Sequence, residues 1–257
     1  MKVVIIGSGN VATVLARRML TAGHEISQVI SRNKKHAGQL AKELKCGYAS
    51  ALEEIRPDAD IYMIAVSDTS LPEIANTLFL DKKLVVHTAG SVPKDILRNI
   101  SRNYGVLYPL QSLRREIETI PEIPILVDGN TPDDLEMIYD FAKTISGHVE
   151  IADDEERSKL HVGAIIVNNF TNHLYRLTEE YCKQEQINFQ LLLPLIYETA
   201  SRLKAFSPGE VQTGPAARND SQTIEKHIKL LGSYPDLQKI YRLMTASIIE
   251  HYKERLS

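Results

Sequence analysis

Residues 1–23 read MKVVIIGSGNVATVLARRMLTAG, and this stretch decides the fold of the first half of the chain. Val3 to Ile6 predict a short buried strand, and an amphipathic helix is indicated behind it by the spacing of Val11, Val14, Leu15 and Met19. The turn between them has the pattern Gly-x-Gly-x-x-Ala. Gly7 permits a tight turn, Gly9 lets a pyrophosphate approach the backbone, and Ala12 lets the helix pack closely on the strand. The free N–H groups and positive dipole of the helix start favour phosphate, so the stretch predicts a Rossmann dinucleotide site. Two alternatives are a turn that merely needs glycine and a site for S-adenosylmethionine.

The end of the second predicted strand distinguishes NADP from NAD. This strand runs from Glu25 to Ile30 and is followed by Ser31-Arg32-Asn33-Lys34-Lys35. An NAD site has an acidic residue about twenty positions after the glycines, to bind the ribose 2′-hydroxyl. Here Ser31 and Arg32 stand at that place, and arginine binds phosphate through two hydrogen bonds. The basic stretch therefore predicts NADP, the alternative being a solvated loop that opens the next helix.

Two later strands end in small polar residues that belong at the same edge of the sheet. Asp60 to Val66 predict a strand that ends at Ser67-Asp68, and Leu84 to His87 predict one that ends at Thr88-Ala89-Gly90. Together with the glycine turn and the basic stretch, these ends supply the predicted cofactor-binding residues: Gly7, Ser8, Gly9, Asn10, Val11, Ala12, Ser31, Arg32, Asn33, Val66, Ser67, Thr88 and Ala89.

Composition limits the classes of function. The chain has 257 residues, a net charge of −3 and two cysteines that are far apart in sequence. It offers no basic surface for nucleic acid, no metal-ligand spacing and no disulfide framework. The apolar run from Val162 to Val167 is too short to span a bilayer. We therefore expect a cytoplasmic protein that needs no metal, membrane or nucleic acid and acts on a small molecule.

The alternation of strand and helix predicts an α/β first half and a helical second half. Further strands are expected at residues 47–48, 104–108, 123–127 and 148–151, and helices at 34–45 and 131–145. This rhythm predicts a mostly parallel sheet. From Asp153 onward the pattern is helical almost throughout. The predicted domains are a Rossmann NADP-binding domain (1–152) and an all-α substrate and dimerisation domain (153–257).

This plan resembles the 6-phosphogluconate dehydrogenase-like superfamily, which includes ketopantoate reductase and pyrroline-5-carboxylate reductase. It is more closely similar to a group of bacterial NADP oxidoreductases with a Rossmann-like domain and a C-terminal domain of unknown function. The resemblance runs along the whole chain and rests on Tyr108-Pro109-Leu110-Gln111-Ser112, on residues 157–168, and on residues 213–220. The sequence departs from that group at Tyr108, where histidine is frequent, and at Ala89, where serine is frequent. The resemblance implies a fold and a cofactor but no substrate.

The first long helix of the second half holds the predicted catalytic residues. Residues 154–184 are expected to form one helix, on which a polar stripe is made by Arg157, His161, Asn168, Asn172 and Tyr175. Enzymes of the superfamily often use a lysine and an asparagine from this helix. Lys159 lies on the side opposite Asn168, and Ala164 occupies the place expected for the lysine. His161 is therefore predicted to donate the proton and Asn168 to polarise the substrate; the alternative is a solvated helix face.

A second polar group is expected to bind substrate. Gly214-Pro215 predicts a turn, and Thr213, Arg218 and Asn219 beside it could bind a carboxylate or phosphate. Asp220 is a candidate substrate ligand, and either Asp220 or Ser221 is expected to cap the helix that follows. Gln111 and Ser112 follow a strand end, where open α/β sheets bind ligands. The expected substrate site is a crevice bounded by Gln111, His161, Asn168 and Arg218.

The function predicted from these features is hydride transfer between NADP and a small, anionic carbonyl or imine compound. The alternatives are an NADP-binding sensor without turnover and a methyltransferase, which the lack of a ribose-binding acid disfavours. The apolar stretch from Leu191 to Ile196 exceeds what one helix face needs and predicts a homodimer formed by the helical half. Burial against the long helix is the alternative for that stretch.

Overall fold

The computed structural model describes residues 1–117 and 119–252 and divides into two compact units. The first unit comprises Met1–Asn168 and the second Asn169–Ser257. The domain boundary predicted at residue 152 stays a prediction.

The first unit is built on a sheet of eight strands in the order β3-β2-β1-β4-β5-β6-β7-β8. All neighbouring strands are parallel except β6 and β7, so the predicted, mostly parallel α/β fold is confirmed. The strands are β1 (Lys2–Ile6), β2 (Glu25–Ile30), β3 (Gly47–Ala49), β4 (Ile61–Ile64), β5 (Asp81–His87), β6 (Ser101–Pro109), β7 (Ile125–Gly129) and β8 (Val149–Ile151).

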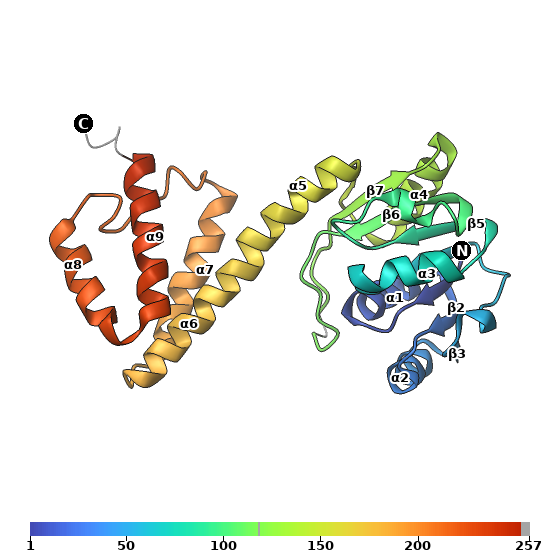
Figure 1. Ribbon diagram of the computed structural model, residues 1–257, viewed down its shortest axis with the longest axis horizontal. Coiled ribbons are helices and arrows are strands. Elements are labelled where there is room, and N and C mark those ends of the chain that lie inside the picture. Colours follow the sequence, from blue (N-terminus) through green and yellow to red (C-terminus); the bar gives the residue numbers. More distant parts are fainter. Residues whose placement is uncertain (118, 253–257) are drawn as a thin grey trace. The chain divides into compact units, whose positions relative to one another are not determined.

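Helices cover both faces of this sheet (Figure 1). One face packs against α1 (Asn10–Thr21), α2 (Lys34–Leu44) and α4 (Pro132–Ile145). The other packs against α3 (Leu71–Thr77) and the 3-10 turn Lys94–Leu97. Strands buried on both faces need continuous apolar runs, and β1 and β4 have them. Burial of these runs is the main favourable contribution to the stability of the unit.

The position of β1 sets the edge where the site forms. β1 lies between β2 and β4, and its last residue, Ile6, is paired with Ile30 of β2 and Ile64 of β4. Three strands therefore end side by side, and the residues that follow them are brought together. Parallel α/β sheets bind ligands at such strand ends, where the strand order changes direction.

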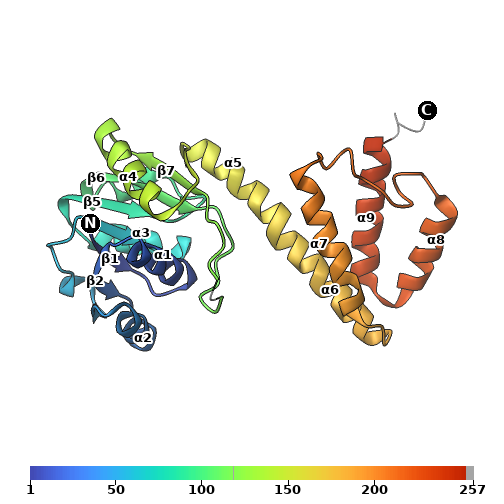
Figure 2. The same cartoon turned by 180° about the vertical axis from the view of Figure 1, so that it is seen from behind.

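The second unit is helical, as expected (Figure 2). Its helices are α6 (Thr171–Gln184), α7 (Leu193–Ser201), α8 (Ser221–Leu230) and α9 (Pro235–Tyr252). In both views α7 lies alongside α6. Buried apolar clusters among the described residues belong to the first unit.

The long helix expected at residues 154–184 is not a regular α-helix. It comprises α5 (Asp154–Ala164), a π-helical segment (Ile165–Phe170) and α6. A π-helix closes i→i+5 hydrogen bonds and therefore has more residues per turn than an α-helix. The constant 100° step used to project the polar stripe is wrong across this segment.

Within the described parts of the chain, no helix is both long and apolar enough to cross a bilayer. The same residues contain no cluster of His, Cys, Asp and Glu suited to a metal ion.

Candidate functional site

A cavity of about 670 Å³ lies at the carboxyl ends of β1, β2 and β4. This volume is in the range of pockets that hold drug-sized ligands and cofactors. The cavity is lined by most of the predicted cofactor-binding residues: Gly7, Ser8, Gly9, Asn10, Val11, Ser31, Arg32, Asn33, Val66 and Ser67. Ala12 is fully buried in the core instead, where it has the packing role expected of the third small residue. Thr88 and Ala89 are buried at the end of β5, outside the cavity lining.

The two glycines of the turn have different reasons to be glycine. Gly7 has φ +127°, and a Cβ there would lie 2.0 Å from the Ala65 carbonyl oxygen. Gly9 has an ordinary extended conformation, φ −84° and ψ −170°, and a Cβ there would meet nothing within 4 Å. The protein itself therefore requires glycine at position 7 but not at position 9. A free space beside Gly9 fits a ligand that approaches the backbone closely.

The start of α1 is open to an anion. Gly9 is its N-cap and has no side chain to accept from the first N–H groups, and the first turn contains no acidic residue. The N–H groups at the start of a helix lack partners within the helix, and the helix dipole makes this end positive. Because Asn10 and Val11 line the cavity, these groups can bind a pyrophosphate there.

The end of β2 presents hydroxyl and amide groups to the same cavity. Ser8 Oγ donates to Ser31 Oγ at 2.8 Å, which links the glycine turn to the end of β2. Asn33 caps α2, and its side chain accepts from the backbone N–H of His36 at 3.0 Å. No carboxylate occupies the first turn of α2. These groups can accommodate a phosphate on the ribose.

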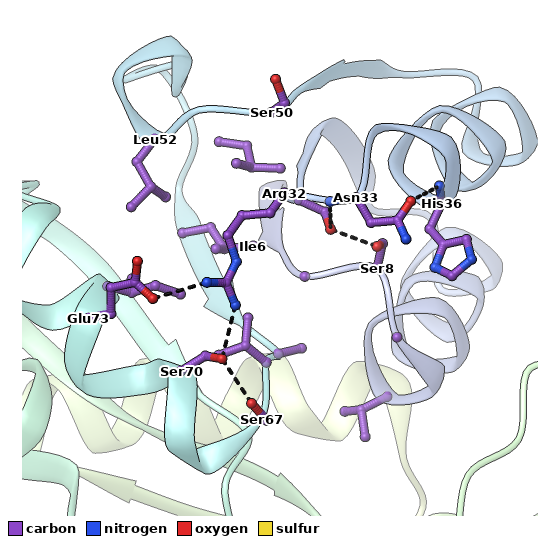
Figure 3. A pocket seen from close by; sticks show the side chains of 18 of the residues that line it. Ile6, Ser8, Arg32, Asn33, His36, Ser50, Leu52, Ser67, Ser70 and Glu73 are labelled. Atoms are coloured by element: carbon purple, nitrogen blue, oxygen red, sulfur yellow. Dashed lines mark hydrogen bonds and ion pairs between the residues drawn. The ribbon is translucent and has the colours of Figure 1, made fainter.

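Arg32 reaches across the cavity to α3 (Figure 3). Its Nη1 lies 3.1 Å from Glu73 Oε2, and its Nη2 donates to Ser70 Oγ at 3.2 Å. Ser70 Oγ is in turn 2.9 Å from Ser67 Oγ. The sequence did not indicate Glu73. Counting residues from the glycines leads to the end of β2, whereas Glu73 lies on α3, which follows β4 in the chain.

Arg115 is a second cavity residue that the sequence did not indicate. It belongs to the connection between β6 and β7, and its carbonyl oxygen accepts from Arg17 Nη1 at 2.7 Å. Arg17 stands on α1 and also pairs with Glu43 at 2.6 Å. The connection is thereby tied to α1, and only tertiary structure brings Arg115 to the cavity that the glycine turn lines.

Tyr108, near the end of β6, contacts His161 of α5; the tyrosine is buried and the histidine is partly exposed. Tyr108 Oη is 2.8 Å from His161 Nδ1, and the two rings meet edge to face. Burial, together with the negative charge of Asp68, raises the pKa of Tyr108, so its hydroxyl keeps the proton and can donate to His161 Nδ1. A Cβ on Gly90 would lie 2.6 Å from His161 Nδ1 and 2.9 Å from Tyr108 Cζ. Glycine at position 90 therefore makes room for the pair.

Arg157 was predicted to belong to a polar stripe of the long helix, and the structure buries it: the residue is only 1% exposed. Its Nη2 donates to the carbonyl oxygen of Val92 at 2.7 Å and to Asp154 Oδ1 at 2.6 Å. Burial alone would raise the pKa of Asp154, but the hydrogen bond and charge of Arg157 hold that pKa below its usual value. Arg157 thus fastens the start of α5 to the segment that follows β5.

His87 fixes the backbone at the end of β5. It is fully buried, and its Nδ1 accepts from the Ala89 N–H at 3.1 Å. Burial and the nearby charge of Arg157 lower the pKa of His87 to about 4, so the ring is neutral at neutral pH.

The other predicted residues of the first unit have separate positions. Asn168 is exposed in the π-helical segment, and its predicted role stays a prediction. Gln111 Nε2 donates to the Glu122 carbonyl oxygen at 3.2 Å, and Gln111 Oε1 accepts from Ser112 N at 2.9 Å. These bonds shape the connection between β6 and β7, and a role in substrate binding stays a prediction for both residues.

The predicted anion-binding loop lies in the second unit. Asp220 caps α8: its carboxylate accepts from Thr223 N at 3.1 Å and from Thr223 Oγ1 at 2.8 Å. Arg218 is exposed, and Thr213 lies before Gly214, whose φ is +106°. The capping prediction is confirmed, while substrate binding by Thr213, Arg218 and Asp220 stays a prediction.

Comparisons with known proteins agree with the geometry of the cavity. Residues 2–90 match the family described as "NADP oxidoreductase coenzyme F420-dependent", and residues 123–248 match "Domain of unknown function (DUF2520)". A crystal structure of a candidate NADP oxidoreductase from Bacteroides fragilis is 36% identical, with a TM-score of 0.91 over 97% of this chain and 98% of that chain. The chain belongs to this family of candidate NADP oxidoreductases.

More distant structures share the fold of this oxidoreductase family. A pyrroline-5-carboxylate reductase from Streptococcus pyogenes is 13% identical, with a TM-score of 0.66 over 97% of this chain and 98% of that chain. An imine reductase from Myxococcus stipitatus in complex with NADP+ is 17% identical, with a TM-score of 0.62 over 99% and 93%. A comparison with curated proteins gives no match. The predicted resemblance to this family, with its Rossmann-like first half, is confirmed.

Proposed function

We propose that this chain binds NADP(H) in the cavity at the ends of β1, β2 and β4 and transfers hydride to a small carbonyl or imine compound. The observation that carries the proposal is the free space beside Gly9 at the uncapped start of α1. The pyrophosphate would lie there, and Ser31, Arg32 and Asn33 would surround the 2′-phosphate.

The bound cofactor supplies the hydride, and the chain must supply a proton and exclude water. His161 is our candidate for the proton donor. In its protonated form the imidazole donates from Nδ1 to Tyr108 Oη, and it can pass the Nε2 proton to the oxygen or nitrogen of the substrate, which leaves the neutral ring. Tyr108 holds the ring in that orientation. Loss of one oriented donor of this kind costs on the order of a hundredfold in rate.

The substrate class rests on the sequence and on the family. An anionic carbonyl or imine compound is proposed because Thr213, Arg218 and Asn219 form a polar loop suited to a carboxylate or phosphate. A screen of NADPH oxidation against 2-keto acids and cyclic imine carboxylates, followed at the absorbance of the reduced cofactor, tests this class. Oxidation with neutral compounds alone would contradict the anionic part of the proposal.

Cofactor binding is tested separately from turnover, by calorimetric titration with NADPH and NADH. We expect tighter binding of NADPH, and we expect Arg32→Asp to weaken NADPH binding about 10- to 100-fold, because a charge-assisted bond is replaced by repulsion. Arg176→Asp on α6 is the matched control: it makes the same charge change at another exposed ion pair and should leave both affinities unchanged. Equal affinity of the parent protein for the two cofactors would refute the NADP preference.

A further inference from the structure

The guanidinium of Arg32 is already engaged by α3. Its two terminal nitrogens have partners at 3.1 Å in Glu73, which is on α3, and at 3.2 Å in Ser70, which is the N-cap of α3. Figure 3 shows the side chain extended over the cavity toward Glu73 and away from Asn33 and His36. The groups expected around a 2′-phosphate and the charge expected to bind it are therefore on different sides of the cavity.

Glu73 has the chemistry of a competitor for that phosphate. A carboxylate and a phosphate present the same kind of anionic oxygen to a guanidinium. Glu73 also lines the same cavity as Ser31, Arg32 and Asn33. A phosphate that recruits Arg32 must replace Glu73 as its partner, and the released carboxylate then lies in the same cavity as a second anion.

We propose that Glu73 reduces the preference of this site for NADPH by holding Arg32 against α3 when no 2′-phosphate is present. The inference rests on the proposed binding of NADP in this cavity. It assigns to Glu73 a selective penalty on NADPH: NADH has no 2′-phosphate, does not need Arg32, and can bind while the ion pair stays intact.

The size of the penalty follows from the exposure of the pair. The Arg32 and Glu73 side chains are 75% and 65% exposed, so water screens their attraction. The gain on removing the carboxylate should therefore be modest, about 3- to 10-fold in NADPH affinity. Because this ion pair is weak, a phosphate can readily displace Glu73 from Arg32.

The test is a fluorescence titration of the full chain with NADPH and NADH, using Glu73→Gln. This change keeps the shape of the side chain and removes its charge. We expect NADPH affinity to rise about 3- to 10-fold and NADH affinity to stay within about twofold. Glu180→Gln is the matched control, because it removes the same charge from another exposed Arg–Glu pair, on α6, and should change neither affinity.

A double-mutant cycle with Arg32→Ala distinguishes two possible effects of Glu73: holding Arg32 in the ion pair, and repelling the phosphate directly. If Glu73 acts by holding Arg32, adding Glu73→Gln to Arg32→Ala should change NADPH affinity by less than about twofold. A full gain in that background, an equal gain for NADH, or no gain in the single variant would overturn the inference. Failure of the parent protein to bind NADPH would instead refute the proposed function, and the inference with it.

Discussion

At the scale of single residues, the glycines of the first turn can be tested against each other. Gly7→Ala places a Cβ against the Ala65 carbonyl in a backbone conformation that side chains disfavour, so we expect a loss on the order of 2–5 kcal/mol in unfolding free energy. Gly9→Ala meets open space in an ordinary conformation and should keep or slightly raise stability while weakening NADPH binding. Urea unfolding and NADPH titration of both variants measure the contrast. Unchanged NADPH affinity in Gly9→Ala would count against a cofactor at this turn.

His87 makes stability depend on pH. Its pKa is lowered to about 4 by burial and by Arg157, so the unfolded chain takes up a proton at higher pH than the folded protein does. The contribution of neutral His87 is therefore present above about pH 6.5 and is lost as the pH falls toward 4, by about 3 kcal/mol in total. Urea unfolding between pH 7 and 4 should show this slope. His87→Asn, which keeps an acceptor for the Ala89 N–H, should flatten it; the same slope in that variant would assign it to other groups.

At the scale of elements, the start of α5 depends on a capping box. Asp153 accepts from Glu156 N at 2.8 Å, and Glu156 Oε2 accepts from Asp153 N at 3.4 Å. Asp153→Ala should cost about 1 kcal/mol of unfolding free energy, and Asp153→Ser should restore most of it because serine also caps. Chemical denaturation measures both. A loss of similar size in Asp153→Ser would show that the charge matters more than the cap.

At the scale of the whole molecule, the helical unit has too little core for its size. Among its described residues only Cys182, Ala216, Ile224 and Leu231 are buried apolar side chains, whereas Leu191 and Leu195 are 73% and 61% exposed. Exposed apolar surface of this kind is typical of an interface with another protein, and we propose that a second copy of the chain covers it. The alternative for this stretch, burial against the long helix, does not account for these exposed side chains.

Light scattering at micromolar concentration tests the dimer. We expect twice the mass of one chain for the parent protein and a shift toward the monomer for Leu195→Lys. Phe79→Lys changes an exposed apolar residue of the first unit and should leave the dimer intact. A monomeric parent protein would contradict this prediction.

The sequence by itself determined the α/β fold, the glycine turn and the basic end of β2, which has no carboxylate at the ribose position. These features are local: alternating apolar runs, a turn of small residues and a helix start lie within a few tens of residues of one another. The cap at Asp220 was predictable for the same reason.

Only tertiary structure decided which distant residues meet. Glu73, Arg115 and the Tyr108–His161 pair come from separate elements, and no spacing along the chain indicates their contacts. The burial of Arg157 and the π-helical segment were not predicted, because a helical projection assumes one constant step and shows no neighbours. Packing fixes which side chains a helix buries and which strand ends share an edge, and packing is a property of the folded chain rather than of any short stretch of it.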